Sequence, residues 1–151
     1  MRLFLVRHGE AAASSEDSLR PLTSEGKKRS VQVAKLVASL ASKESLLVHG
    51  QLLRSLETAE LIANENPKMR REECSLVSPY GDPVALCSWI IAREERHLVL
   101  VGHEPQLSSI ASYFLLGELR PILQIKKSGI IVLKKEHESW SLRALLAPKH
   151  Y

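Results

Sequence analysis

Two apolar runs, each leading into a glycine and a histidine, constrain the fold of this chain more than any other feature. Residues 3–6 (LFLV) lead into Arg7-His8-Gly9, and residues 98–101 (LVLV) lead into Gly102-His103. Continuous apolar runs of this length are typical of strands that are buried on both faces of a parallel sheet. Ligands of α/β proteins bind beyond the carboxyl ends of such strands, so the polar residues here are candidate ligand contacts.

The rest of the chain alternates between helical and strand-like patterns. Thr23 can cap a helix whose apolar stripe contains Val33, Leu36, Val37 and Leu40. Further helices are expected over residues 52–63, 82–91 and 105–115. Strands are expected at 46–49, at 97–101, at a short edge strand over 76–77, and in a closing hairpin over 130–133 and 140–145. This order predicts an α/β fold, a three-layer αβα sandwich with a mostly parallel, mixed sheet, in one domain over residues 1–151.

Composition indicates an ordinary globular protein. Hydrophobic residues make up 44% of the chain and charged residues 25%, while aromatic residues are only 5%, so aliphatic side chains must form the core. The two cysteines, Cys74 and Cys87, lack the spacing of a metal or redox site and suggest a reducing compartment. The first apolar run is too short for a signal peptide or a membrane span. We therefore expect a cytoplasmic protein with no membrane partner.

The net charge of +4 comes from basic clusters that are scattered along the sequence, at residues 27–29, 68–71, 126–127 and 134–135. A nucleic-acid partner would require a basic stripe, ideally with aromatic side chains for stacking, and none is predicted. Two interpretations remain: solvated ends of helices and strands, or attraction to an anionic substrate. No particular oligomeric state is predicted.

The strand-end residues suit phosphate chemistry. Arginine donates bidentate hydrogen bonds to phosphate oxygens, and a neutral histidine can attack phosphorus near pH 7. Arg7, His8 and His103 supply these groups, with His103 expected in its protonated form as a donor. Arg54 falls in the first turn of the helix over 52–63, where helix N-termini bind anions. The histidines lack a metal-binding pair such as His-x-x-x-His, so we expect no metal and no cofactor.

Four motifs together resemble the histidine phosphatase superfamily, and within it the small SixA-type phosphohistidine phosphatases. They are Arg7-His8-Gly9, residues 20–26 (RPLTSEG), residues 53–59 (LRSLETA) and residues 101–105 (VGHEP). The resemblance implies that His8 becomes phosphorylated. It also implies that Arg7, Arg54 and His103 surround the phosphate and that no metal is required. The long insertions that build substrate lids in mutase-like relatives are missing.

One position departs from the family pattern, and one role in that pattern has no certain counterpart in this sequence. Residues 49–51 (HGQ) stand where many relatives have a Ser-Pro pair, so a serine contact to phosphate is not expected. Larger relatives use a glutamate of the middle segment as proton donor, and here Asp82 is the candidate, ahead of Glu72 or Glu73. An imidazole leaving group needs less protonation than an alkoxide, so this role could be dispensable. Glu104 is expected to cap or orient the helix that follows it.

The resemblance thus predicts a metal-independent phosphatase that acts on phosphohistidine in a phosphorelay or phosphocarrier protein through a covalent phosphohistidine intermediate. Two alternatives remain. The substrate could be a small phosphorylated metabolite, or the protein could be a non-catalytic phosphate-binding interaction module. The presence of Arg7, His8, Arg54 and His103 together argues against the second alternative, because a decayed site usually loses a nucleophile or an anion-binding residue.

Overall fold

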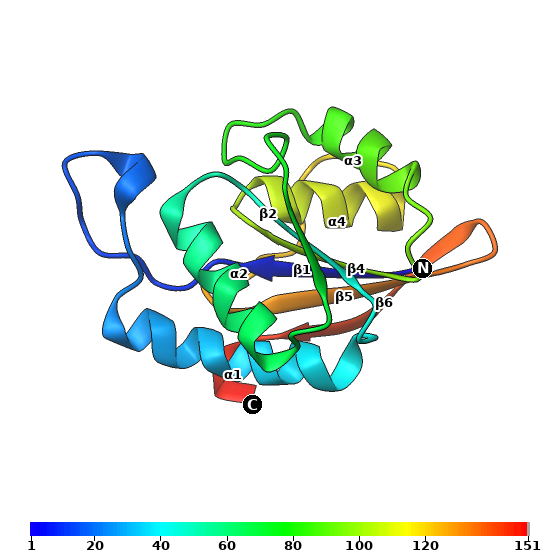
Figure 1. Ribbon diagram of the computed structural model, residues 1–151. Coiled ribbons are helices and arrows are strands. Elements are labelled where there is room, and N and C mark those ends of the chain that lie inside the picture. Colours follow the sequence, from blue (N-terminus) through cyan, green and yellow to red (C-terminus); the bar gives the residue numbers. More distant parts are fainter. Residues whose placement is uncertain (151) are drawn as a thin grey trace.

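The computed structural model describes residues 1–150 and contains a six-stranded mixed sheet between two pairs of helices (Figure 1). The sheet order is β3-β2-β4-β1-β5-β6, and the first four of these strands are parallel. β5 runs antiparallel to β1, and β6 antiparallel to β5. The strands are β1 (Arg2–Arg7), β2 (Leu46–His49), β3 (Arg70–Glu73), β4 (His97–Gly102), β5 (Ile130–Glu136) and β6 (Ser139–Leu146).

The helices form the two outer layers. They are α1 (Ser24–Leu40), α2 (Leu53–Glu65), α3 (Pro83–Ile91) and α4 (Gln106–Leu116), with 3-10 turns η1 (Asp17–Leu19) and η2 (Pro148–His150). In Figure 1, α3 and α4 cover one face of the sheet, and α1 and α2 cover the other. The predicted three-layer αβα sandwich is therefore confirmed.

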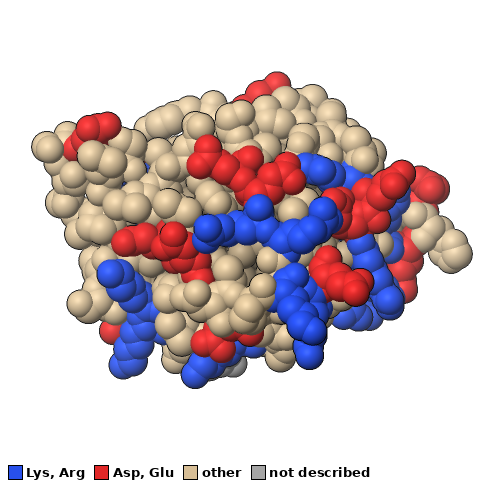
Figure 2. Space-filling model, viewed as in Figure 1, with Lys and Arg blue, Asp and Glu red and all other residues tan. Residues whose placement is uncertain are grey.

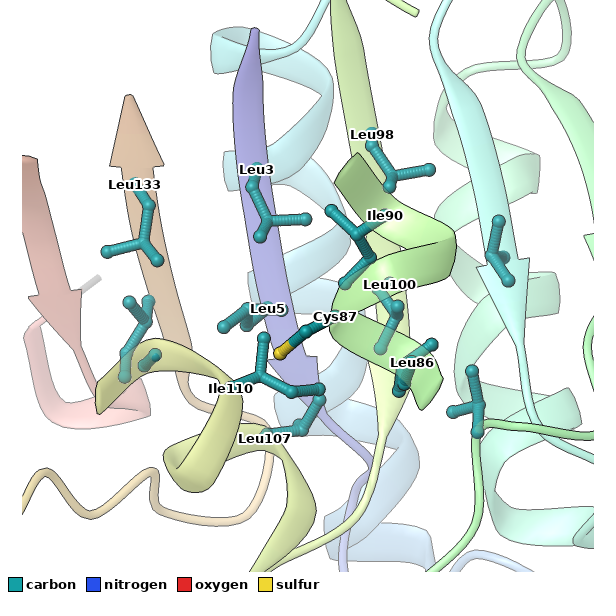
Figure 3. Close-up of a cluster of buried hydrophobic side chains, with 14 of the residues drawn as sticks. Leu3, Leu5, Leu86, Cys87, Ile90, Leu98, Leu100, Leu107, Ile110 and Leu133 are labelled. Carbon is teal, nitrogen blue, oxygen red and sulfur yellow. The ribbon is translucent and has the colours of Figure 1, made fainter. Parts of the chain in front are cut away.

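Each face of the sheet carries its own apolar core, because alternate residues of a strand point to opposite faces. Leu3 and Leu5 of β1 pack with Leu86 and Ile110 beneath α3 and α4 (Figure 3). The intervening residues of β1, Phe4 and Val6, pack with side chains of α1 and α2. All four of these β1 side chains are fully buried. The apolar runs of the sequence are continuous because both faces are covered.

The prediction of an edge strand over residues 76–77 is wrong. The strand at this edge of the sheet, beside β2, is β3; its four residues are all exposed and charged, and it pairs in parallel with β2. Charged side chains are common on edge strands, and here the backbone pairing outweighs the low strand propensity of the sequence. Val77 is buried but lies in a loop, where its backbone N–H bonds to the Cys74 carbonyl oxygen.

The helix starts follow the predicted signals. The Thr23 hydroxyl accepts a hydrogen bond from the Gly26 N–H at 2.9 Å and caps α1. Pro83 is the first residue of α3, which follows Asp82 as predicted.

The position of β4 between β1 and β2 decides what meets at the sheet edge. In the parallel pairing of β1 with β4, Arg7 lies opposite Gly102. The residues that follow these strands, His8 and His103, are therefore neighbours, and β2 ends beside them on the far side of β4.

Candidate active site

His8 and His103 lie side by side beyond the ends of β1 and β4. Their ring centroids are 5.0 Å apart, with an interplanar angle of 50°. The backbone N–H of His8 donates to the Gly102 carbonyl oxygen at 3.1 Å, which fastens the first strand end to the second. Both imidazoles are buried, and His8 retains 8% exposure. One ring can therefore be reached from outside while the protein surrounds the pair.

The tautomer of His8 follows from its single hydrogen bond. Nδ1 lies 2.7 Å from the carbonyl oxygen of Gly9, which can only accept, so Nδ1 carries the proton. Nε2 then keeps a free lone pair. Burial first, and then the nearby charges of Arg54, Arg7 and Lys127, lower the pKa of His8 to about 4, although the hydrogen bond to Gly9 acts in the opposite direction. At pH 7 His8 is a neutral imidazole with an available nucleophilic nitrogen.

His103 differs from the sequence-based expectation. Burial first, and then the neighbouring His8 and Arg54, lower its pKa to about 3, so the ring is neutral at pH 7 rather than protonated. Neither ring nitrogen has a hydrogen-bond partner among the described residues. A neutral imidazole still has one N–H, so His103 can donate one hydrogen bond to an anion beside His8.

The two predicted arginines lie at the same place. Arg54, in the first turn of α2, is 6% exposed, and the Nε atoms of Arg54 and Arg7 are buried without a hydrogen-bond partner in the part of the chain that the structure describes. The structure brings all four predicted residues, Arg7, His8, Arg54 and His103, to one cavity of about 250 Å³. Its other lining residues are Ala11, Arg20, Pro79, Glu104 and Lys127. Buried donors without partners in a basic cavity form a suitable site for a phosphate-sized anion.

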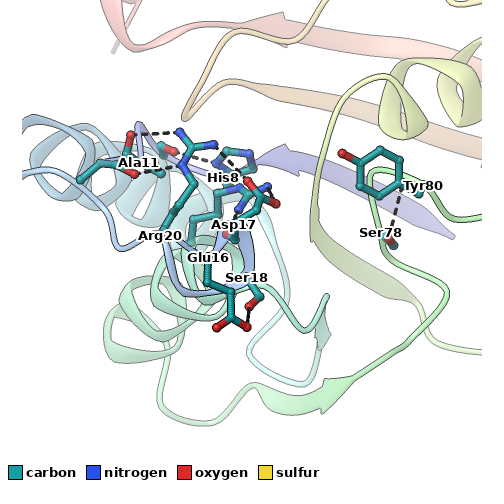
Figure 4. Close-up of polar contacts among 11 residues, drawn as sticks. His8, Ala11, Glu16, Asp17, Ser18, Arg20, Ser78 and Tyr80 are labelled. Atoms are coloured by element: carbon teal, nitrogen blue, oxygen red, sulfur yellow. Dashed lines mark hydrogen bonds and ion pairs between the residues drawn. The ribbon is translucent and has the colours of Figure 1, made fainter. Parts of the chain in front are cut away.

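The loop before α1 adds a carboxylate that the sequence analysis missed. The Arg54 guanidinium donates to the backbone oxygen of Asp17 at 2.9 Å and to its carboxylate at 3.2 Å. Arg20 pairs with the same carboxylate at 3.3 Å and donates to the Ala12 carbonyl oxygen. Figure 4 shows Asp17 and Arg20 beside His8. The hydrogen bond from Arg54 is the main cause that lowers the pKa of Asp17, so this carboxylate stays ionised. In the sequence, the one indication of a role for Asp17 was its position three residues before Arg20, with which it pairs.

The polar side chains of the 53–59 motif hold the surrounding loops. The Ser55 hydroxyl donates to the Val101 carbonyl oxygen at 2.9 Å, and the Thr58 hydroxyl accepts from the Gly9 N–H at 3.1 Å. Glu57 accepts from the Leu22 N–H at 2.6 Å. One face of α2 thereby fixes the ends of β1 and β4 and the loop that carries Asp17.

Glu104 performs the orienting role that the sequence suggests. Its carboxylate accepts hydrogen bonds from the Ser108 N–H in the first turn of α4 and from the Ile125 N–H at 2.8 Å. The Ile125 carbonyl oxygen in turn accepts from the Arg7 guanidinium at 2.9 Å. Glu104 and Arg7 therefore both hold the backbone of Ile125, Glu104 through its N–H and Arg7 through its carbonyl oxygen.

Asp82 does not line this cavity. Its carboxylate accepts the Val84 N–H at 2.9 Å and caps α3. The role of Asp82 as proton donor therefore stays a prediction without geometric support. Gly50, in the departing 49–51 segment, has no room for a side chain, because a Cβ there would lie 2.2 Å from the Val77 carbonyl oxygen.

Within residues 1–150 there is no group of three or more His, Cys, Asp or Glu side chains that could hold a metal ion. No helix in that range is long and apolar enough to cross a membrane. Among its lining residues the cavity has the nucleophilic nitrogen of His8, the guanidinium groups of Arg7 and Arg54, and an N–H donor on His103. This set can bind a phosphoryl group and receive it on His8.

Comparison with known proteins places these features in a family. The model of the histidine phosphatase superfamily (branch 1) matches residues 3–74. An uncharacterized protein of Picosynechococcus is 32% identical over 161 residues, covering 99% of this chain and 98% of that protein.

Solved structures share the whole fold. A structure of the protein histidine phosphatase SixA complexed with tungstate superposes with a TM-score of 0.87 at 21% identity, covering 99% of both chains. The α-ribazole phosphatase of Shigella flexneri superposes with a TM-score of 0.76 at 15% identity, covering 98% of this chain and 97% of that one. The fold is thus common to enzymes named for a protein substrate and for a small metabolite.

Proposed function

This chain belongs to the histidine phosphatase superfamily, and from that premise we propose that it hydrolyses phosphohistidine on a protein substrate through a covalent intermediate on His8. Members of the family are phosphatases. The observation that carries the proposal is the neutral His8, whose Nδ1–H is held by the Gly9 carbonyl oxygen in a cavity that Arg7 and Arg54 also line. Two buried free cysteines, Cys74 and Cys87, accord with a cytoplasmic location.

The reaction has two steps. His8 Nε2 attacks phosphorus, and the P–N bond of the substrate breaks with its electron pair going to the departing imidazole nitrogen. The substrate ring leaves as a neutral imidazole when its other nitrogen already carries a proton, and otherwise the departing nitrogen takes up a proton from water. Water then attacks the phosphorus on His8, which releases inorganic phosphate and restores the free imidazole. Arg7 and Arg54 stabilise the charge that spreads over the phosphoryl oxygens in both transition states, and His103 donates one hydrogen bond.

The surroundings of the cavity favour a leaving group that needs little protonation. The Asp17 carboxylate is paired with Arg54 and Arg20 and is ionised at pH 7. Glu104 already accepts hydrogen bonds from Ser108 and Ile125. Neither carboxylate is arranged as an acid for an alkoxide, whereas a phosphohistidine releases an imidazole. This supports a P–N substrate over an alkyl phosphate such as most small metabolites carry.

The test compares variants of two histidines that have the same backbone setting but different neighbouring side chains. His49 is also buried at a strand end, and its Nδ1 lies 2.8 Å from the Gly50 carbonyl oxygen, as His8 relates to Gly9. We expect His8→Ala to abolish hydrolysis of a phosphohistidine protein in the presence of a metal chelator, while His49→Ala retains it. Phosphoryl label trapped from the wild-type protein should be on His8, stable in base and labile in acid.

Substrate comparison separates this proposal from the metabolite alternative. We expect kcat/KM to be much higher for phosphohistidine and aryl phosphates than for alkyl phosphate monoesters. Asp82→Asn should change phosphohistidine hydrolysis only mildly. Faster hydrolysis of a sugar phosphate than of phosphohistidine would assign the protein to metabolite phosphatases, and an active His8→Ala protein would refute the covalent mechanism.

A further inference from the structure

A second, larger hollow adjoins the phosphate cavity. We call it the basic groove; its volume is about 640 Å³. Its walls come from the first half of α1, the turn before β5 and the segment around η2, which packs against α1 near the C-terminus in Figure 1. The lining residues are Arg7, Glu25, Lys28, Arg29, Gln32, Lys126, Lys127, Ala147, Pro148 and Lys149. Six of them are basic and one is acidic.

Most of this positive charge is uncompensated. The one carboxylate, Glu25, pairs with Arg29 at 2.7 Å. Lys28, Lys127 and Lys149 form no ion pair with any part of the chain that the structure describes. Unpaired cations around a concave surface concentrate positive potential there and attract anions.

The face that carries β3 provides a contrast. Figure 2 shows basic and acidic side chains interspersed on this face. The arginines there are paired, Arg70 with Glu95, Arg71 with Glu60 and Arg93 with Glu72. The basic groove is therefore distinct from the ordinary surface of this protein.

The groove lies next to the phosphate cavity. Arg7 and Lys127 line both. The turn that carries Lys127 is anchored beside the nucleophile, because the backbone N–H of Ser128 donates to the His8 carbonyl oxygen at 3.2 Å. A group bound in the groove can thus belong to the same molecule as a phosphoryl group at His8.

We propose that the basic groove binds carboxylate side chains that flank the phosphohistidine of a protein substrate; this inference rests on the proposed function. The lysines are exposed and come from three separate segments, whereas Arg54 is buried. Such a spread of flexible point charges fits several carboxylates rather than one phosphate. The lining contains no aromatic side chain on which nucleic-acid bases could stack.

The test uses four peptides of equal length that carry one phosphohistidine or one phosphotyrosine, flanked on both sides by glutamate or by glutamine. We expect wild-type kcat/KM to be about tenfold higher or more for each glutamate peptide than for its glutamine partner at low salt. In the variant Lys28→Glu/Lys126→Glu/Lys149→Glu this ratio should fall to about one or below. The matched control Lys43→Glu/Lys68→Glu/Arg96→Glu changes the net charge equally, at exposed residues outside the groove, and should keep the wild-type ratio.

The outcomes separate this inference from the proposed function. A glutamate preference on phosphotyrosine peptides without any hydrolysis of phosphohistidine would support the groove and refute the substrate class. A wild-type ratio near one, or the same loss in both triple variants, would overturn the groove. Stronger inhibition by a single-stranded oligonucleotide than by a glutamate peptide of equal charge would overturn it as well. Hydrolysis of none of the four peptides would contradict both proposals.

Discussion

Two histidines show how neighbours determine what a residue can do. His8 and His49 are both buried, both follow or end a parallel strand, and both hydrogen-bond the carbonyl oxygen of the next glycine. His8 shares its cavity with Arg7, Arg54 and His103, whereas His49 is not among the cavity residues. The residue type and its backbone setting are thus the same, and only the surrounding cations distinguish a candidate nucleophile from a structural histidine.

Arg54 is the residue on which the phosphate site depends most directly. It is buried, lines the cavity beside His8, and donates a hydrogen bond to the carboxylate of Asp17. We expect Arg54→Ala to reduce kcat/KM on an aryl phosphate a hundredfold or more, or about 3 kcal/mol of transition-state stabilisation. Arg54→Lys should recover little of this loss, since an ammonium cannot reproduce a bidentate contact.

The control is Arg70→Ala, which replaces an exposed arginine of β3 and should leave kcat/KM unchanged. Near-normal turnover of Arg54→Ala would mean that its guanidinium serves only to hold the Asp17 loop.

At the scale of elements, the junction between β2 and α2 shows why the family's Ser-Pro pair cannot simply be restored. Gly50 packs against the Val77 carbonyl oxygen, and a Cβ there would also lie 3.4 Å from His103 Nε2. The Gly50 N–H also donates a hydrogen bond to the Ser55 hydroxyl of α2 at 3.2 Å, which holds the junction against the helix. This strand-to-helix turn is therefore built around a glycine.

We expect Gly50→Ser to destabilise the protein by about 2 kcal/mol and to lower activity, because the 77 loop must move away from the added Cβ. Denaturant unfolding and aryl phosphate turnover measure the two effects. Gly117→Ala is the comparison: it adds a Cβ in open space at a helix end with φ 76°, so it should cost about 1 kcal/mol and leave turnover intact. A more active Gly50→Ser protein would show that the serine finds a phosphate contact after all.

At the scale of the whole molecule, folding buries two imidazoles next to cations, and this couples stability to pH. The pKa of His8 falls to about 4 and that of His103 to about 3, below the ordinary 6.5. As pH drops below 6.5 the unfolded chain binds protons that the folded protein does not, so the free energy of unfolding decreases until these folded pKa values are reached. Above pH 6.5 both histidines are neutral in the folded and in the unfolded state. There they do not change the free energy of unfolding with pH.

Between pH 7 and pH 5 we expect a loss on the order of 2 kcal/mol for each of these histidines. Urea unfolding at the two pH values measures it. The variant His8→Gln/His103→Gln should lose correspondingly less over the same interval. If inorganic phosphate binds in the cavity and favours the protonated rings of His8 and His103, it should reduce the pH dependence of the free energy of unfolding. Equal losses in the variant and the wild type would show that other groups cause the pH dependence.

The sequence by itself determined those features that depend on residues close together in the chain. The strands around residues 3–6 and 98–101 follow from apolar runs, and α1 begins at Thr23 because a local hydrogen bond caps it. Arg7 ends β1 and His8 follows it, so the sequence alone places both residues at the same edge of the sheet. These local signals predict the observed strands and helix because they agree with the burial and the helix capping of the folded protein.

The tertiary structure decided what depends on distant contacts. The charged strand β3 exists because β2 pairs with it, and no local propensity indicates this. The sheet order placed β4 beside β1 and so set His103 against His8. The contact of Asp17 with Arg54 and the gathering of Lys28, Lys127 and Lys149 in one groove arise in the same way. Each joins residues far apart in the chain, and only the packing of the sheet and its helices specifies such pairs.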